Sequence, residues 1–249
     1  MRKICVGNIT CYNEDYRNVL PLFDYDSFEL AIPDPNYGIG AAKMAFTRET
    51  NRPCKQKNGT YINVSKKAYI QKDWDDEAPD YSFFTDIERI STNQIIWGID
   101  FFDWADKVGL GRIKWNKGFS ERMSFRGFER AYCSLIDYER EVDVLWAGFQ
   151  QAKSLSEPMT AQGNKQKNEK RIHPTQKPTI LYKRLLLDYL PNGGSIIDTH
   201  GGSFSSAVAA LDLGIDMVII EKDKDHFADG ISRLKEVYNK KKTMLQFAV

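Results

Sequence analysis

Short apolar runs alternate with segments of helical periodicity in the C-terminal part of the chain. Residues 195–198 and 217–221 have the continuous apolar character of strands that are buried on both faces. Residues 178–189, 205–213 and 225–238 carry apolar side chains at helical spacing. Strands that alternate with helices in this way are typical of a parallel sheet covered on both faces. We therefore expect an α/β fold.

Further strands and one further helix are predicted upstream. The strand segments are residues 28–32, 94–98, 111–115, 130–136 and 142–146, and residues 80–91 space apolar side chains at helical intervals. With the C-terminal elements they predict a Rossmann-like, mostly parallel sheet of about seven strands with helices on both faces. Residues 48–72 and 154–171 are polar and lack an apolar period, so we expect loops there, the first of them mobile.

Composition excludes several classes of protein. Hydrophobic residues make up 42% of the 249 residues and charged residues 28%, which is enough apolar material for a folded core. Mean hydropathy is −0.50, and no stretch approaches the ~18 uncharged apolar residues of a membrane span. The N-terminus meets polar residues before any apolar run of signal-peptide length, so we expect a cytoplasmic protein. The four cysteines lack C-x-x-C spacing, so we interpret them as reduced thiols, and we expect no metal site.

Charge is balanced overall but uneven along the chain. The formal net charge is +1, from 35 basic and 34 acidic residues. Residues 71–88 are acidic, whereas residues 111–130 and 165–177 are basic, and aromatic side chains are interleaved in the first basic run. A single charged run is typical of a solvated surface, but two basic runs favour a polyanionic partner. The candidate contacts to such a partner are Lys114, Lys117, Arg122 and Arg126.

A glycine-containing turn joins the predicted strand 195–198 to the predicted helix 205–213. Glycines after a parallel strand let a ligand approach the backbone, and the helix N-terminus offers free N–H groups. Glu221 ends the next strand, where a carboxylate can hold ribose hydroxyls. The dinucleotide pattern G-x-G-x-x-G is absent from this turn, so a small nucleoside-bearing ligand is favoured over NAD or FAD. A purely structural turn is the alternative.

The segment after strand 28–32 can grip a planar amine. Asp34 offers a carboxylate and Pro35 a carbonyl, so the two can accept both hydrogens of an amino group. Tyr37 offers a ring that can stack on the face of the amine-bearing group. An ordinary Asp-Pro turn is the alternative here. A third segment, His173–Pro178, forms a rigid strip rich in hydrogen-bond donors just before a predicted helix.

These segments together resemble the circularly permuted (beta-class) DNA amino-methyltransferases. Residues 173–178 spell H-P-T-Q-K-P, the hallmark of that family. In the family a catalytic D-P-P-Y comes first and an S-adenosylmethionine loop, D-x-F-x-G-S-G-T, comes last, and residues 34–37 and 198–205 stand in that order here. The resemblance extends to residues 13–16, 93–102, 111–117 and 129–135. It implies one domain over residues 1–249, with variable loops at about 41–80 and 147–170.

The resemblance implies an S-adenosylmethionine-dependent DNA methyltransferase. Such an enzyme moves a methyl group to an exocyclic amino group, most often that of adenine, in a flipped-out base. The implied catalytic residues are Asp34, Pro35, Asn36 and Tyr37. The implied cofactor-binding residues are Asp15, His173, Thr175, Lys177, Asp198, His200, Gly201, Gly202, Ser203 and Glu221. Double-stranded DNA is the implied partner, and no membrane is involved. The resemblance leaves open whether the protein forms a homodimer, and it identifies no restriction enzyme as a partner.

Several positions depart from the family pattern. Asn36 replaces the second proline, His200 replaces a phenylalanine, residues 99–100 replace Gly-Asn, and Phe204 stands where the third glycine of the cofactor loop belongs. The Phe204 ring either fills the space for the methionine moiety or points into the core between sheet and helix, and we expect the second. The alternatives are a degenerate methyltransferase fold that binds DNA or a partner without turnover, a cytosine amino-methyltransferase, and a small-molecule or RNA methyltransferase.

Overall fold

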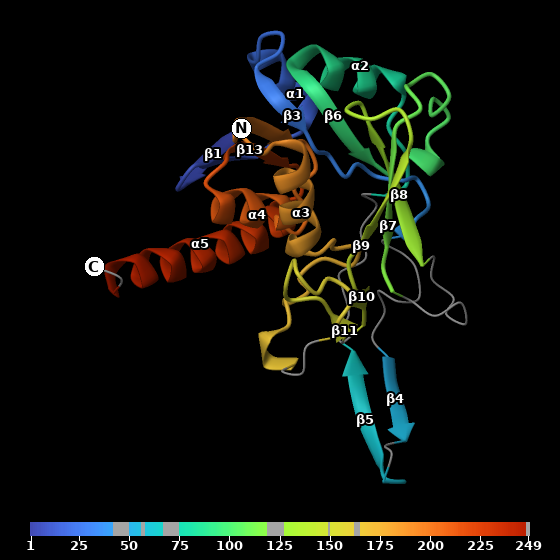
Figure 1. Ribbon diagram of the computed structural model, residues 1–249. Coiled ribbons are helices and arrows are strands. Elements are labelled where there is room, and N and C mark those ends of the chain that lie inside the picture. Colours follow the sequence, from blue (N-terminus) through green and yellow to red (C-terminus); the bar gives the residue numbers. More distant parts are fainter. Residues whose placement is uncertain are drawn as a thin grey trace.

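Figure 1 shows a computed structural model of the chain, in which residues 1–41, 50–55, 58–66, 75–118, 127–148, 150–161 and 165–247 are described. The strands are β1 (Arg2–Val6), β2 (Ile9–Asn13), β3 (Phe28–Ala31), β4 (Thr50–Lys55), β5 (Tyr61–Lys66), β6 (Ser91–Trp97), β7 (Arg112–Asn116), β8 (Phe128–Cys133), β9 (Glu139–Asp143), β10 (Trp146–Ala147), β11 (Gln150–Gln151), β12 (Ser195–Asp198) and β13 (Asp216–Glu221). The α-helices are α1 (Tyr16–Val19), α2 (Tyr81–Ile90), α3 (Thr179–Tyr189), α4 (Ser205–Leu213) and α5 (Lys224–Phe247). Short 3₁₀ turns lie at Leu20–Leu22, Ile99–Phe101 and Lys165–Lys167.

A nine-stranded sheet organises the described residues, in the order β1-β2-β13-β12-β3-β6-β8-β7-β9. The central strands β2, β13, β12, β3 and β6 are parallel, whereas β1 and β8 run against their neighbours. The mostly parallel α/β sheet is therefore confirmed. The two strands beyond the seven expected are β1 and β2, which form a hairpin whose turn includes Gly7 at φ +60°. No strand was predicted for this N-terminal segment.

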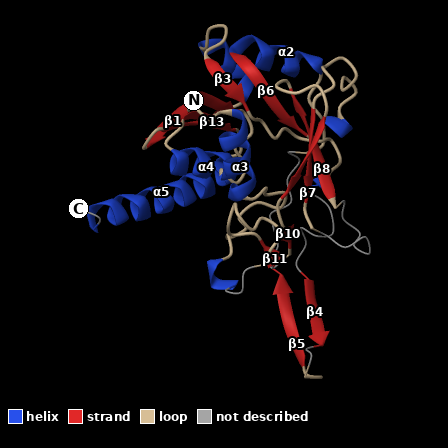
Figure 2. Cartoon of the chain, in the orientation of Figure 1, coloured by secondary structure: helices blue, strands red, loops and turns tan. Residues whose placement is uncertain are grey.

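Helices cover both faces of the sheet, as the apolar strands predict (Figure 2). Successive side chains of a strand point to opposite faces, so Ile196 and Ile219 join one core while Ile197 and Ile220 join the other. The first core includes buried residues of α3, α4 and α5, and the second includes those of α1 and α2. Helices therefore pack on both faces of the sheet, and the loops that connect them to the strands lie at its edges.

The pattern of apolar residues predicts the bounds of several C-terminal elements correctly. The bounds of β12 and α4 agree with the prediction, and α5 continues beyond the predicted residues to Phe247. Figure 1 shows that the C-terminal part of α5 extends away from the body of the molecule. The predicted strand 142–146 is wrong, because β9 ends at Asp143 and a separate short strand, β10, begins at Trp146.

The expectation of a loop over residues 48–72 is also wrong in part. Strands β4 and β5 pair antiparallel in a hairpin that projects from the body (Figure 1). Its turn includes Asn58 and Gly59, and Gly59 has φ +85°. Asn-Gly is a strong hairpin signal because the glycine accepts positive φ without strain, and it outweighed the polar composition on which the loop expectation depended.

Candidate active site

Three parallel strands end side by side and deliver the candidate loops to one edge of the sheet. Strand β12 lies between β13 and β3, so the segments after Asp198, Glu221 and Ala31 are neighbours. The backbone continues the pairing for one more step, because the Ile32 N–H donates to the Ile197 carbonyl at 2.8 Å. Ligands of open α/β sheets bind outside the carboxyl ends of such strands. The structure therefore brings the Asp34 segment and the 198–205 loop together although they are far apart in sequence.

Tyr37 is held in a defined position over β6 and its following turn. Its hydroxyl donates to Asp34 Oδ1 at 2.7 Å, and its ring stacks on Phe101 with centroids 5.0 Å apart and planes 12° apart. Gly98 lies directly beneath the ring at φ +81°, and an added Cβ there would lie 2.1 Å from a ring carbon of Tyr37. Glycine is therefore required at this position for the ring to lie where it does.

A chain of alternating charges begins at Asp34. The Lys177 ammonium lies 2.5 Å from Asp34 Oδ1, 2.8 Å from the Tyr37 hydroxyl and 3.0 Å from Glu129 Oε2. The second Glu129 oxygen pairs with Lys117. The Lys177 side chain is only 3% exposed, whereas Asp34 and Glu129 are about one fifth exposed. We expected Lys177 beside the cofactor; the structure instead places its charge on Asp34.

The neighbouring charges decide which of these groups are ionised. Burial alone would raise the pKa of Glu129, but the ammonium groups of Lys117 and Lys177 outweigh burial and lower it to about 2. Burial lowers the pKa of Lys177, and the carboxylates of Asp34 and Glu129 reverse this, so its pKa is raised. Burial raises the pKa of Asp34 despite the Lys177 ammonium. Burial and these carboxylates also hold the pKa of Tyr37 well above its ordinary value, so the phenol stays protonated.

The Asp198 carboxylate closes the loop that follows β12. Its Oδ1 accepts from the His200 N–H at 2.9 Å and its Oδ2 from the Ser206 hydroxyl at 2.6 Å, and the residue is 1% exposed. Burial raises the pKa of Asp198 to about 7, because hydroxyl and N–H donors offset only part of the loss of water. The buried Asp198 side chain therefore stabilises the loop through these two hydrogen bonds.

Glu221 supports the same loop from the next strand. Its Oε2 accepts from the Gly202 N–H at 2.6 Å and its Oε1 from the Asp223 N–H at 2.7 Å. Asp15 lies on the adjacent connection, where it caps α1 through the Arg17 N–H at 3.0 Å and pairs with Lys222 at 2.8 Å. Asp15 and Glu221, two of the three acidic residues expected near the cofactor, therefore lie at the carboxyl ends of neighbouring strands, β2 and β13.

His200 forms part of an aromatic wall beside this loop. Its ring lies 5.1 Å from that of Tyr16 and 5.6 Å from that of Phe83, and its Nδ1 is 2.9 Å from the Thr199 hydroxyl. Burial lowers the pKa of His200 to about 3, so the imidazole is neutral near pH 7. The replacement of the family's phenylalanine therefore keeps an uncharged ring at this position.

The Phe204 ring points into the core between sheet and helix. It is fully buried and packs edge-on against Phe227 of α5, with centroids 6.0 Å apart. Two glycines make room for it: an added Cβ on Gly230 would lie 2.4 Å from the ring, and one on Gly201 would lie 2.7 Å from it. The backbone of Phe204 has φ +58°, which strains a residue that carries a Cβ. The ring thus leaves the mouth of the loop, in the way we expected.

Gln176, in the H-P-T-Q-K-P strip, joins a polar network that ties the strip to the cofactor loop. Its amide donates to Glu169 at 2.8 Å, and Glu169 pairs with Arg233 of α5 at 2.5 Å. Arg233 also donates to the Ser203 carbonyl at 2.6 Å and to the Thr179 hydroxyl at 2.8 Å. Neither Glu169 nor Arg233 is a candidate from sequence, because Glu169 is one charge in a basic run and Arg233 is one charge on a predicted helix.

His173 and Thr175 lie next to each other in the same strip. The Thr175 hydroxyl is 3.2 Å from His173 Nδ1, and the His173 ring packs edge-on against that of His226, with centroids 4.4 Å apart. An added Cβ on Gly202 would have the His173 ring as its nearest neighbour, at 3.9 Å. The His173 ring of the strip therefore lies next to Gly202 of the cofactor loop, and a Cβ added at Gly202 would be in ordinary van der Waals contact with it.

Comparison with known families decides which protein family this geometry belongs to. The family described as DNA methylase matches residues 41–232. The chain belongs to the DNA methylase family. The DNA adenine methyltransferase YhdJ of Escherichia coli (strain K12) is 36% identical over 62 residues, which are 25% of this chain and 21% of YhdJ. The match thus spans about a fifth of that relative's length.

The fold was also compared with solved structures. PvuII DNA methyltransferase, described as cytosine-N4-specific, has a TM-score of 0.51 at 12% identity, and the match covers 94% of this chain and 92% of that one. The M1.HpyAVI–SAM complex has a TM-score of 0.48 at 16% identity, covering 90% of this chain and 99% of that one. The first likeness confirms the methyltransferase fold.

The described basic side chains of the predicted DNA-contacting run have partners within the protein itself. Lys114 pairs with Glu141 at 2.7 Å, and Lys117 pairs with Glu129. Arg112 donates to backbone carbonyls, with the shortest distance, 2.6 Å, to that of Gly109. Arg122 and Arg126 lie outside the described residues. The described part of this run is therefore tied to the protein's own carboxylates and carbonyls.

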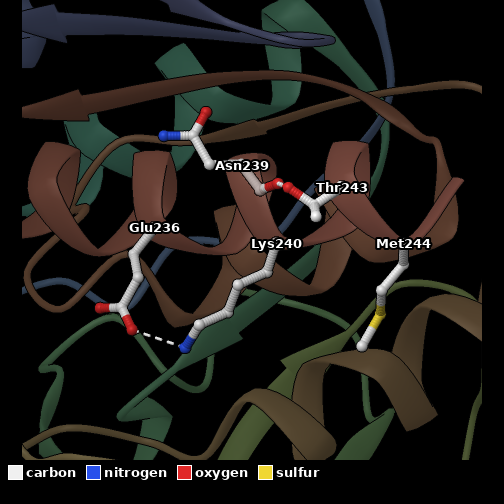
Figure 3. Close-up of a pocket in the computed structure, with 5 residues that line it drawn as sticks. All are labelled: Glu236, Asn239, Lys240, Thr243 and Met244. Carbon is white, nitrogen blue, oxygen red and sulfur yellow. Dashed lines mark hydrogen bonds and ion pairs between the residues drawn. The ribbon is translucent and has the colours of Figure 1, made fainter. Parts of the chain in front are cut away.

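Other candidate features of the methylase are weaker. No group of three or more His, Cys, Asp or Glu among the described residues could hold a metal ion. Within the same residues, no helix has the length and apolar character needed to cross a membrane. Figure 3 shows a surface hollow lined by one helix alone, with Glu236 and Lys240 paired at 2.6 Å; the lining residues are Glu236, Asn239, Lys240, Thr243 and Met244. The edge of the sheet remains the candidate active site.

Proposed function

We propose that the chain is an active S-adenosylmethionine-dependent DNA methyltransferase that methylates the exocyclic amino group of a flipped-out adenine. The observation that carries this proposal is the position of the Lys177 ammonium, 2.5 Å from Asp34 Oδ1 and 2.8 Å from the Tyr37 hydroxyl. The Lys177 ammonium is a nitrogen that donates hydrogen bonds, as the target amine does. It is bound to Asp34, the carboxylate that corresponds to the one the resembled family uses for its target amine. Membership of the DNA methylase family supports the same reaction.

The order of the two loops along the chain supports the circularly permuted class. The Asp34 segment follows β3 and the 198–205 loop follows β12, and these strands are neighbours in the sheet although residues 32–194 separate them in sequence. The sheet holds both loops at one edge, so we propose a single domain over residues 1–249 with the variable segments inserted between its strands.

The residues around the 198–205 loop are suited to S-adenosylmethionine. The Phe204 ring is withdrawn into the core, so it does not fill the mouth of the loop. Glu221 and Asp15 would bind hydroxyl or amino groups, while His200 offers a neutral ring and Ser203 a hydroxyl group. We assign Asp198, Gly201, His173 and Thr175 to the support of this loop. The cofactor supplies a sulfonium methyl group.

Asp34 would accept one hydrogen of the target amine and the Pro35 carbonyl the other, with the Tyr37 ring against the base. The Lys177 ammonium has to move off Asp34 Oδ1 toward Glu129, with which it is already paired at 3.0 Å. The amine nitrogen would bond to the methyl carbon as the bond from that carbon to the sulfonium sulfur breaks and the sulfur keeps the electron pair. The methylated nitrogen then carries one proton too many, and Asp34 is placed to take that proton. Burial raises the pKa of Asp34, which makes the carboxylate a better base than one in water. Flipping the base costs a few kcal/mol, and most of the acceleration comes from positioning.

Asp34→Ala tests the catalytic assignment. We expect methylation of DNA to be abolished and the dissociation constant for S-adenosylmethionine to stay within about tenfold of the wild type, because the side chain acts on the target amine. Calorimetry and single-molecule sequencing of methylated DNA measure the two effects. A wild type that binds no cofactor would favour the degenerate alternative, and methylation at cytosine would favour the cytosine enzyme.

DNA contact is assigned to Arg122 and Arg126, with smaller contributions from Lys114 and Lys117. Each phosphate contact adds about 0.9 to the slope of log affinity against log salt concentration. We expect Arg122→Ala or Arg126→Ala to lower that slope by about this amount. Lys114→Ala should lower it less, because Glu141 already pairs with the Lys114 ammonium at 2.7 Å. Equal slopes in all four proteins would return this basic run to the solvated-surface interpretation.

A further inference from the structure

A carboxylate from a distant part of the sequence fixes the turn that follows Tyr37. Asp75 is 2% exposed, and its Oδ1 accepts from the Tyr37 N–H at 2.7 Å and from the Gly38 N–H at 3.2 Å. Its Oδ2 accepts from the Ala41 N–H at 2.7 Å, and its carbonyl oxygen accepts from the Gly40 N–H at 3.0 Å. Asp75 therefore closes the whole turn over residues 37–41.

The turn itself has the composition of a flexible segment. Gly38 and Gly40 have φ values of +69° and +66°, which glycine adopts without strain. Because glycine also adopts many other backbone conformations, these two residues do not fix the turn by themselves. Asn36 stands where the resembled family has a second proline, whose ring would fix φ near −65°. Among the described residues, the Asn36 N–H donates no backbone hydrogen bond. The rigidity of the turn must therefore come from outside it.

We propose that Asp75 is a positioning residue that replaces the missing proline and holds Tyr37 and Asp34 in place for methyl transfer. This proposal rests on the proposed function. Hydrogen bonds to the Tyr37 and Gly38 N–H groups fix the backbone that carries the Tyr37 ring over Gly98 and its hydroxyl onto Asp34. A displacement of about 1 Å at a reacting group costs about a hundredfold in rate.

Asp75→Asn tests this role with little change in side-chain size, because both carboxylate oxygens of Asp75 accept hydrogen bonds from N–H groups. An amide of the same size would turn its NH₂ group toward the N–H of either Ala41 or Tyr37, so one side of the contact is lost. Asn36→Pro supplies the rigidity by another route. Glu77→Gln is the matched control, because Glu77 is an exposed carboxylate two residues away.

The experiment measures kcat and KM of the wild type, Asp75→Asn, Asn36→Pro, the double variant and Glu77→Gln on a DNA oligonucleotide. We expect Asp75→Asn to lower kcat by about tenfold to a hundredfold and to change the cofactor dissociation constant less than about twofold. Asn36→Pro should raise kcat of Asp75→Asn at least about threefold, and by a larger factor than it changes kcat of the wild type. Equal kcat in Asp75→Asn and Glu77→Gln, or the same effect of Asn36→Pro in both backgrounds, overturns the proposal.

Hydrogen exchange separates this proposal from the proposed function. The amides of Tyr37, Gly38 and Ala41 should exchange faster in Asp75→Asn, and unchanged exchange overturns the positioning role whatever the activity. A wild type that does not methylate DNA, with faster exchange in the variant, overturns the proposed function and supports the role of Asp75 in the turn. If Asp75→Asn is unfolded at the assay temperature, Asn36→Pro should restore folding, and a double variant that is equally unfolded overturns the proposal.

Discussion

Burial acts on both ends of the candidate active site, but its outcome is opposite for Glu129 at one end and Asp198 at the other. At the Asp34 end, carboxylates alternate with ammonium groups, and the pKa of Glu129 is lowered to about 2. At the loop end, Asp198 has only N–H and hydroxyl donors, and its pKa is raised to about 7, while that of His200 is lowered to about 3. The neighbours of a buried group, more than its depth, decide whether it is charged.

This difference suits the two ends to different chemistry. The Asp34 end keeps charges in balanced pairs, so it can bind an amine on which positive charge develops. At the loop end, burial disfavours the charged forms of Asp198 and His200, and the neutral His200 ring suits the uncharged aromatic part of a nucleoside-bearing ligand. The predictions below break this contrast one group at a time.

Lys177→Met removes the central cation of the Asp34 end and should have the largest effect. It leaves Asp34 and Glu129 near each other without their shared partner, so we expect a loss of about 3–5 kcal/mol in the free energy of unfolding. The loss should grow as pH rises from 5 to 8, because one carboxyl group then has to release a proton in an unfavourable site. Denaturant unfolding at several pH values measures this.

Lys183→Met is the matched control for that variant. Lys183 pairs with Asp212 at 2.5 Å on the surface of α3, and both side chains are 29% exposed. We expect a loss below about 1 kcal/mol, because exposed ion pairs contribute little. Similar losses in the two variants would contradict the special role of the buried charge chain.

Asp198→Asn should remove a pH-dependent cost at the loop end. The folded pKa, about 7, lies above the ordinary value of 3.8, so Asp198 destabilises the wild type as pH rises through this window. The unfolding free energy of the variant, relative to the wild type, should therefore rise by on the order of 3 kcal/mol between pH 4 and pH 7. A constant difference over that range would mean that Asp198 ionises normally.

His200→Phe should show the opposite slope and a smaller effect. The folded pKa, about 3, lies below the ordinary value of 6.5, so the wild type loses stability as pH falls through this window. Relative to the wild type, the variant should gain roughly 2 kcal/mol between pH 6.5 and pH 5. Thermal or denaturant unfolding checks the sign, and a slope like that of Asp198→Asn would contradict a neutral imidazole.

Local pattern explains which parts of the fold could be predicted. The apolar runs of β12 and β13 and the helical spacing of α4 identify those elements, because their side chains meet core on both sides. The β4–β5 hairpin was missed since its composition is polar, although Asn58-Gly59 carried the turn signal. The N-terminal β1–β2 hairpin was missed because β1 is a short edge strand whose residues are mostly exposed, so it contains no continuous apolar run.

The active site could be predicted in part for a different reason. The loops that contain Asp34 and Asp198 carry recognisable motifs, so their residues were named before their positions were known. The pairing of Lys177 with Asp34 joins residues 143 positions apart, and that of Asp75 with the Tyr37 N–H joins residues 38 apart. A contact between a side chain and a distant backbone N–H leaves no periodic signal, so Asp75 was seen only as one charge in an acidic run.

The hydrogen bonds of Asp75 also define where the chain can tolerate change. Because Asp75 binds the Ala41 and Gly40 N–H groups, the two described residues on either side of positions 42–74, Ala41 and Asp75, lie next to each other. A loop whose ends are already joined adds little closure entropy when it lengthens, about 0.6 kcal/mol for each doubling. This segment is therefore a natural place for insertion, replacement or grafting, in which the reach of the protein changes while the geometry at Asp34 stays the same.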